Sequence, residues 1–296
     1  MNVEKLETQR AVVGDGFEIR RALPNHHRRM IGAWCFFDHA GPANYAAGQG
    51  ITIGPHPHMG LQTFSWMIEG RILHTDSLGY RQWIEPGQVN LMTAGRGISH
   101  AEESPADAPG RFQLAQLWIA LPKAESEREP SFHHYPDLPI LERGGFRMTV
   151  LAGTFAGARA PAEVFSPLVG LDLASPGPAR TELDLDPAFE HGVMTLEGTA
   201  TVGGEPLAPG ALLYFGTGGG KLPIETSAAS RLLLIGGRPF GEEVLLWWNF
   251  VGRSFEDMER ATSDWLETDR FGKVEGARGA PLVAPDLRGL RMRGVR

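Results

Sequence analysis

Two histidines separated by one proline, His56 and His58, stand at the start of a segment whose other residues favour a β-strand. Residues two apart on a strand point to the same face, with their backbones about 6.6 Å apart. Two imidazoles at that spacing can close around one metal ion. Pro57 donates no hydrogen bond to a sheet, so it favours an edge strand or a bulge, where side chains converge.

A second pair with the same spacing, His100 and Glu102, follows a glycine-rich turn. A lone pair of this kind is more often a solvated turn or a hydrogen-bonded buried pair. Two such pairs on neighbouring strands favour a metal site with three ring nitrogens and one carboxylate. His39 and His74 lie close to these pairs in sequence and are candidates for hydrogen-bond partners of the ligands, although packing is the favoured interpretation for both.

The chain contains 38 glycines and 22 prolines, which divide it into short apolar segments typical of strands joined by turns. We expect such strands to position the candidate ligands. In one such strand, Phe64, Trp66 and Ile68 alternate with other residues, and we expect their face to be the better buried one. The 296 residues are long enough for two domains. The polar, proline-rich stretch 121–145 predicts a boundary near residue 140 and hence domains at 1–140 and 141–296.

The second half of the chain repeats features of the first. "LEG" at 196–198 matches "IEG" at 68–70, and Pro209-Gly210 matches Pro86-Gly87. This indicates an internal duplication of one β unit. The stretch 253–267 then predicts the one convincing helix, with Ser254 as its N-cap.

The duplicated unit lacks the histidines. An offset of 128 residues places Asp184 and Asp186 where His56 and His58 stand, and an offset of 123 aligns Pro223 and Glu225 with His100 and Glu102. Proline offers no ligand, and a set made only of carboxylates suits a hard cation rather than a redox metal. We therefore expect one metal ion per chain, held by the first domain.

Composition narrows the function classes. The net charge of −7 disfavours direct nucleic-acid binding, and the arginines at 288, 291, 293 and 296 are interpreted as a terminal tail. Cys35 is the single cysteine, so no internal disulfide forms. The first ten residues lack the apolar run of a signal peptide, and no stretch reaches the length of a membrane helix. We expect a cytoplasmic protein that does not bind membranes.

Five segments follow one another along the first half of the chain: "FFDHAGP" at 36–42, "GPHPHMGLQTFSWMIEG" at 54–70, "LHTDSLG" at 73–79, "MTAGRGISHAE" at 92–102 and "LAQLWIALP" at 114–122. Their order and spacing resemble the pirin family, two-barrel members of the cupin superfamily. The resemblance is strong over residues 34–136 and implies an all-β fold of two cupin-type antiparallel β-barrels with a C-terminal helix. It also implies the same four metal ligands, His56, His58, His100 and Glu102.

The resemblance implies an activity as well. Three imidazoles and one carboxylate leave two positions of an octahedral ion open for O₂ and a chelating substrate, and Fe(II) is the expected metal, with Mn, Ni, Co or Cu as alternatives. Pirins are similar to dioxygenases that open flavonols, so a quercetin 2,3-dioxygenase type of reaction is expected. Glu102 would receive the substrate proton while still ligated or on release. Trp66 and Met92 are candidates for shaping the aromatic pocket, although packing in the core is the favoured interpretation for both. The alternative is a non-enzymatic, iron-dependent redox sensor that binds a transcription regulator or a metabolic enzyme.

Two departures from the family pattern bear on this expectation. Gln62 stands where the common cupin pattern has a glutamate ligand, which leaves Glu102 as the carboxylate. The stretch 240–253, "FGEEVLLWWNFVGR", differs from the family pattern, so substrate preference or partner contacts on that side are expected to differ.

Overall fold

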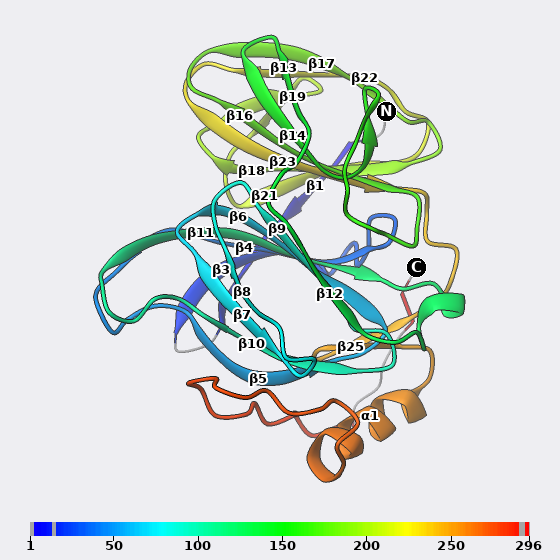
Figure 1. The fold of residues 1–296 in the computed structure, drawn as a ribbon. Coiled ribbons are helices and arrows are strands. Elements are labelled where there is room, and N and C mark those ends of the chain that lie inside the picture. The colour runs from blue at the N-terminus through cyan, green and yellow to red at the C-terminus, as the bar shows by residue number, and fades with distance from the viewer. Residues whose placement is uncertain (1–2, 14–15, 290–293, 296) are drawn as a thin grey trace. The chain divides into compact units, whose positions relative to one another are not determined.

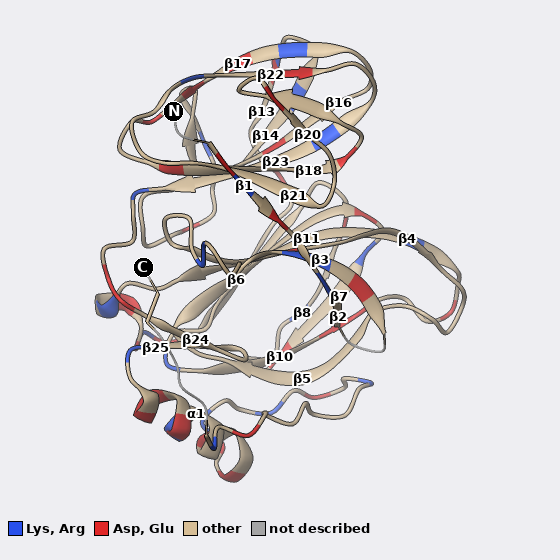
Figure 2. Cartoon of the chain, turned by 180° about the vertical axis from the view of Figure 1, so that it is seen from behind, with Lys and Arg blue, Asp and Glu red and all other residues tan. Residues whose placement is uncertain are grey.

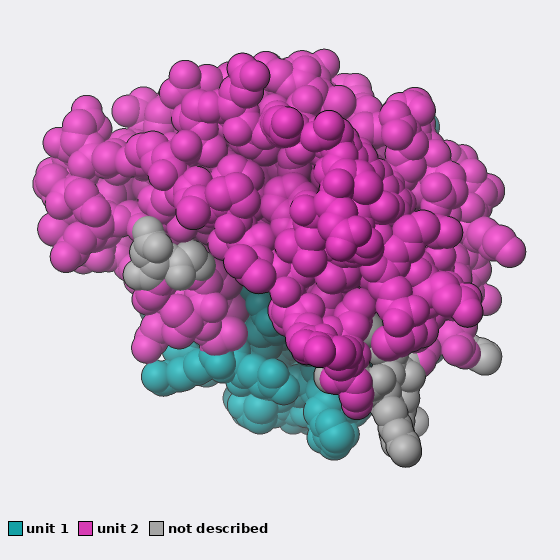
Figure 3. Space-filling model, turned by 90° about the horizontal axis from the view of Figure 1, so that it is seen from below, with its two compact units in different colours: residues 1–10, 20–39, 137–240 teal, residues 11–19, 40–136, 241–296 magenta. Residues whose placement is uncertain are grey.

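The computed structural model describes residues 3–13, 16–289 and 294–295, so Arg291, Arg293 and Arg296 of the tail lie outside the described residues. The chain forms two compact units, each made of segments that are distant in sequence (Figure 3). Unit 1 comprises Met1–Arg10, Arg20–His39 and Asp137–Phe240, and unit 2 comprises Ala11–Ile19, Ala40–Pro136 and Gly241–Arg296.

Unit 2 contains the candidate ligands and is built mainly on two sheets (Figure 1). The larger sheet has the order β12(Ser131–Tyr135), β9(Val89–Thr93), β6(Leu61–Glu69), β11(Gly110–Ala120), β4(Trp34–Tyr45), β3(Phe17–Leu23), β2(Gln9–Val13). The smaller sheet has the order β5(Thr52–His58), β10(Ile98–Glu103), β7(Ile72–Asp76), β8(Arg81–Ile84). A short 3₁₀ helix, η1(Lys123–Glu125), precedes β12.

Unit 1 repeats this arrangement. Its larger sheet has the order β1(Val3–Glu7), β21(Ala211–Phe215), β18(Glu190–Glu197), β23(Ser230–Gly237), β16(Leu168–Ser175), β14(Phe146–Phe155), β13(Ile140–Arg143), and β15(Ala158–Arg159) pairs with β14. Its smaller sheet has the order β17(Ala179–Leu185), β22(Gly220–Thr226), β19(Ala200–Val202), β20(Glu205–Leu207). Strand for strand, β17 and β22 take the places that β5 and β10 have in unit 2.

The core of each unit lies between its two sheets. In unit 2, Met67 of the larger sheet packs in one cluster with Ile72 and Ile84 of the smaller sheet. In unit 1, Leu183 of β17 and Val193 of β18 share one cluster in the same way. Both faces of β6 are buried, so the predicted face does not stand out: Phe64 is 0% exposed and Met67 on the other face is also 0% exposed.

A helix and the segment after it complete unit 2. The short strands β24(Leu245–Trp247) and β25(Phe250–Gly252) pair with each other and lead into α1(Phe255–Glu267). Ser254 caps α1 as predicted: its side chain accepts a hydrogen bond from the backbone of Asp257, and the Asp257 carboxylate accepts one from the backbone of Ser254. Met258 and Ala261 are the buried residues of this helix.

Residues 268–287, which we call the strap, run along β5 and β10 (Figure 1). The backbone N–H of Leu282 donates to the carbonyl of Pro55 at 2.8 Å, and that of Ser99 donates to the carbonyl of Phe271 at 2.9 Å. The carbonyl of Ala280 lies where a Cβ of residue 54 would be, so glycine is required there. The strap therefore covers the edge strand β5, in which Pro57 was predicted to favour an edge or a bulge.

The grouping of α1 and the strap with unit 2 differs from the sequence analysis, which assigned residues 241–296 to the second domain. The boundary near residue 140 stays a prediction. No helix among the described residues has the length and apolar character needed to span a membrane. Lys and Arg are interspersed with Asp and Glu on the strands and on α1 (Figure 2).

Candidate metal centre

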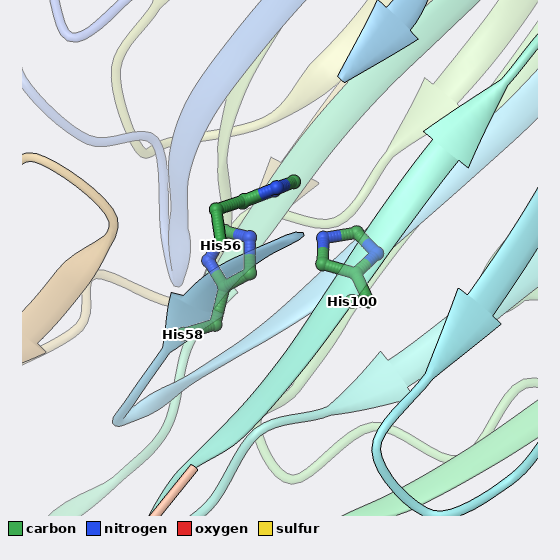
Figure 4. A group of neighbouring side chains, drawn as sticks. All are labelled: His56, His58 and His100. Carbon is green, nitrogen blue, oxygen red and sulfur yellow. The ribbon is translucent and has the colours of Figure 1, made fainter. Parts of the chain in front are cut away.

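The register of two strands brings three histidines together. In the antiparallel pair of β5 and β10, His100 lies opposite His56, and Ile98 lies opposite His58. His56 and His58 point to one face because they are two residues apart, and His100 meets them from the neighbouring strand (Figure 4). All three are buried, with exposures of 6%, 1% and 2% for His56, His58 and His100.

The three rings are close enough to share one ion. Their centroids lie 4.4 Å apart for His56 and His100, and 5.0 Å apart for each of the other two pairs. One nitrogen from each ring lies within 4.8 Å of the others. Among the residues that the structure describes, this is the one group of three or more His, Cys, Asp or Glu side chains with such geometry.

Backbone carbonyls orient two of the rings. Nδ1 of His56 donates to the carbonyl of Gly54 at 2.8 Å, and Nδ1 of His58 donates to the carbonyl of Asn249 at 3.2 Å. These bonds assign the ring proton to Nδ1 and leave Nε2 with its lone pair. Nε2 of His100 is buried and has no hydrogen-bond partner among the described residues. A buried ring nitrogen without a partner fits a position that a metal ion occupies.

Burial keeps the three rings uncharged. It lowers the pKa of His56 to about 4, against the hydrogen bond to Gly54, which raises it. Burial, and then the neighbouring imidazoles, lower the pKa of His58 and of His100 well below the usual value. Because a metal ion binds the neutral imidazole, the triad is ready to bind one at neutral pH. Three imidazoles suit Zn, Cu, Fe and Ni, so the donor set fits a transition metal.

Glu102 is buried next to this triad on β10 but is not a member of it. The pairing of β10 with β5 shifts between His100 and Glu102, and Glu102 lies opposite Ile53. Its carboxylate is not among the ligand atoms that lie within 4.8 Å of one another. Burial raises its pKa from 4.5 to about 7. Its part as a fourth ligand stays a prediction.

We expect metal binding at pH 6 to release a proton from Glu102. The raised pKa means that the folded, metal-free chain holds this proton more tightly than the unfolded chain does, so the associated stability is complete below 4.5 and is lost as the pH rises through about 7. A ligating carboxylate must lose that proton. Calorimetric titration with Ni(II) in buffers of different ionisation enthalpy measures the release, and Glu102→Gln is its control. Equal release from both proteins would contradict a ligand role for Glu102.

The other candidate residues have different surroundings. Met92 packs with Ala94, Ile98 and Phe132 in the core, and Trp66 is 1% exposed. The amide of Gln62 donates to the hydroxyl of Thr93 at 2.9 Å, which ties β6 to β9. These contacts are structural, and none of the three residues belongs to the triad.

Two neighbours of His58 were not found from the sequence. The Trp118 ring lies at 5.2 Å from the His58 ring in an edge-on arrangement, and the carbonyl of Asn249 orients His58. Asn249 lies in the stretch 240–253 that departs from the family pattern. That departure was the one available signal, because a backbone carbonyl leaves no mark of its own in a sequence.

Packing was the favoured interpretation for His74, but the structure places its ring beside a candidate metal ligand. Nδ1 of His74 lies 3.3 Å from Nδ1 of His100. His39 belongs to unit 1 and is buried there, and burial lowers its pKa to about 4.

The corresponding strands of unit 1 present leucines. Leu183 of β17 lies opposite Leu222 of β22, as His56 lies opposite His100. Leu183 and Leu222 are fully buried, whereas Asp184 and Asp186 are exposed. The alignment of these aspartates with His56 and His58 was therefore wrong.

Glu225, the other predicted carboxylate, is also exposed and forms an ion pair with Arg180 at 3.2 Å. Apolar side chains thus replace the imidazoles in the core of unit 1. The stoichiometry of one metal ion per chain stays a prediction.

Comparisons with known proteins agree with this architecture. Residues 16–119 match the pirin family model, and residues 170–272 match the model of the pirin C-terminal cupin domain. A Pseudomonas aeruginosa protein named "Putative quercetin 2,3-dioxygenase" is 49% identical over 96% of this chain and 90% of its own length. A pirin-like protein of Caulobacter vibrioides is 36% identical over 84% of this chain and 88% of its own.

A solved structure gives the same result. The crystal structure of quercetin 2,3-dioxygenase from Acinetobacter baumannii superimposes with a TM-score of 0.96 and 47% identity, and covers 99% of this chain and 98% of its own. The expected fold of two cupin domains with a C-terminal helix is thereby confirmed. The chain belongs to the pirin family.

Proposed function

We propose that this protein is a metal-dependent dioxygenase that opens flavonols, with Fe(II) as its metal and quercetin as the model substrate. The observation that carries the proposal is the buried triad of neutral imidazoles, in which Nε2 of His100 has no protein partner among the described residues. The quercetin 2,3-dioxygenase names of relatives at 49% and 47% identity support the substrate class.

The proposed ligand set is His56, His58, His100 and Glu102. Iron bound by these residues would supply the redox chemistry that joins O₂ to the flavonol. The carbonyls of Gly54 and Asn249 hold two of the rings, so these ligands need little reorganisation when the substrate binds. Ni, Co, Mn and Cu remain alternatives, because imidazole accepts all of them and copper binds more tightly than iron at equal supply.

Glu102 would act as the proton acceptor of the reaction. Burial raises the pKa of Glu102 to about 7 in the metal-free chain, so its surroundings favour a protonated carboxyl, and on the metal it would take up the proton while still ligated or on release. A carboxylate oxygen of Glu102 would receive the proton of the flavonol hydroxyl when the substrate binds. The cytoplasmic location expected from the charged N-terminus, the lack of long apolar stretches and the single cysteine belongs to the same proposal.

We expect the Fe(II) form to consume O₂ and quercetin together. The protein is loaded anaerobically and mixed with O₂, and O₂ uptake is recorded beside the loss of quercetin absorbance. The zinc-loaded protein is the control, because zinc accepts the same ligands but does no one-electron chemistry. A protein that consumes no flavonol, but binds a protein partner only in its Fe(II) or only in its Fe(III) form, would favour the redox-sensor function instead.

A further inference from the structure

His100 is the end of a chain of three buried polar side chains. Nδ1 of His100 lies 3.3 Å from Nδ1 of His74, and Nε2 of His74 lies 3.0 Å from Oδ2 of Asp76. These hydrogen bonds connect β10 with β7, and His100 lies opposite Asp76 in the register of the two strands. All three are nearly inaccessible to solvent, with exposures of 2%, 3% and 2% for His100, His74 and Asp76.

The far end of this chain is fixed by the backbone. Oδ1 of Asp76 accepts the N–H groups of Leu78 at 2.9 Å and Tyr80 at 3.0 Å, which leaves Oδ2 to face His74. The His74 ring stacks on Phe132 with centroids 4.2 Å apart and an angle of 13° between the planes. Both the carboxylate and the middle ring are therefore held in place.

We infer that Asp76 and His74 are positioning residues that place the ring proton of His100 on Nδ1. A carboxylate only accepts, so the proton of a neutral His74 lies on Nε2. Nδ1 of His74 is then an acceptor, and Nδ1 of His100 donates to it. The lone pair of His100 is left on Nε2, the atom that has no other partner. The hydrogen bonds of Asp76 and His74 therefore prepare His100 as a ligand before any metal binds.

This inference rests on the proposed metal site, because the tautomer of His100 matters for metal binding. Its test does not require a metal. Ring tautomers are measured on the metal-free protein, in which ¹⁵N chemical shifts of labelled histidine separate protonated from bare ring nitrogens. We expect His100 protonated at Nδ1 and His74 protonated at Nε2. A wild-type His100 with its proton on Nε2, or a His74 protonated on both nitrogens, would overturn the inference.

The substitution Asp76→Asn is expected to reverse the direction of both hydrogen bonds, while the side chain keeps its size and shape. The amide oxygen must stay with the N–H groups of Leu78 and Tyr80, so the amide nitrogen faces His74 and donates to its Nε2. The proton of His74 then moves to Nδ1, and His100 has to accept there and carry its own proton on Nε2. We expect both rings to change tautomer and the affinity for Ni(II) to fall about 10–100-fold.

Asp186→Asn is the matched control, because Asp186 also accepts a backbone N–H two residues further on, that of Ala188 at 2.8 Å, but lies in unit 1. It should change neither the tautomers nor the affinity. The variant His74→Phe keeps the ring stack and removes both nitrogens. In that background Asp76→Asn should have no further effect on Ni(II) affinity.

The outcomes separate the two hypotheses. Loss of affinity from Asp76→Asn in the absence of His74, or an unchanged His100 tautomer in Asp76→Asn, would overturn the role of this chain. A wild-type protein with the expected tautomers that binds no Ni(II) would overturn the metal site while leaving the tautomer assignment intact.

Discussion

The variant His100→Ala is expected to lose its metal. His100 supplies one of the three nitrogens of the triad and the one whose Nε2 has no partner among the described residues. The two imidazoles of β5 cannot replace it. The loss of affinity should exceed the 10–100-fold that is typical when only a hydrogen-bond partner of a ligand is removed. Elemental analysis after anaerobic iron loading and desalting measures the metal per chain, and His58→Ala should behave in the same way.

The control for this experiment is His133→Ala. His133 is exposed on β12 of the same unit, so its removal should leave the metal content near one ion per chain. A full metal content in either His58→Ala or His100→Ala would show that the triad is not the metal site. A content near two ions per chain in the wild type would show that unit 1 also binds metal, despite its leucines.

Phe271→Ala is expected to destabilise the protein by about 3–5 kcal/mol, the usual cost of removing a buried phenylalanine. Phe271 is 2% exposed, and its ring stacks on Phe250 with centroids 5.6 Å apart. The carbonyl of Phe271 also accepts the hydroxyl of Ser99 at 3.0 Å, one residue before His100. A cavity at this point therefore loosens the strap where it holds the strand of the triad.

Chemical denaturation measures this loss as a lower midpoint of unfolding. The control is Phe255→Ala at the start of α1, where the ring is 37% exposed and the cost should stay below about 1 kcal/mol. Equal midpoints for Phe271→Ala and the wild type would contradict the stabilising role of the strap.

The histidine triad was predictable because it depends on local geometry. The spacing of His56 and His58 sets their common face in any strand, and the similar pair at His100 required only that the two strands lie side by side. Glu102 shows the limit of this argument. The register shift after His100 breaks the alternation, and a bulge of this kind leaves no clear mark in the sequence.

A one-residue difference in offset explains the error in unit 1. The alignment of "LEG" on "IEG" used an offset of 128 residues, whereas the strand ends His58 of β5 and Leu185 of β17 lie 127 residues apart. The alignment therefore displaced β17 by one residue and put its outward aspartates in the place of its inward leucines. In a strand, a shift of one residue is enough to do this.

Contacts between distant segments could not be predicted from the sequence. Asn249 contacts His58 across 191 residues, and the strap contacts β5 across a longer interval, from Pro55 to Leu282. No periodicity encodes such a meeting, because it results from packing of the helix and the strap on a finished sheet. Only α1 and its cap at Ser254, which depend on local signals, could be predicted there.

The carbonyl of Asn249 has a consequence for biosynthesis, because a ribosome produces His58 long before it produces Asn249. At about 5–20 residues per second, the interval of 191 residues takes roughly 10–40 s. For most of this time the nascent chain carries all three imidazoles, but the groups that orient His58 and cover β5 have not been translated. The oriented form of the triad is therefore completed only after residue 249 has been synthesised.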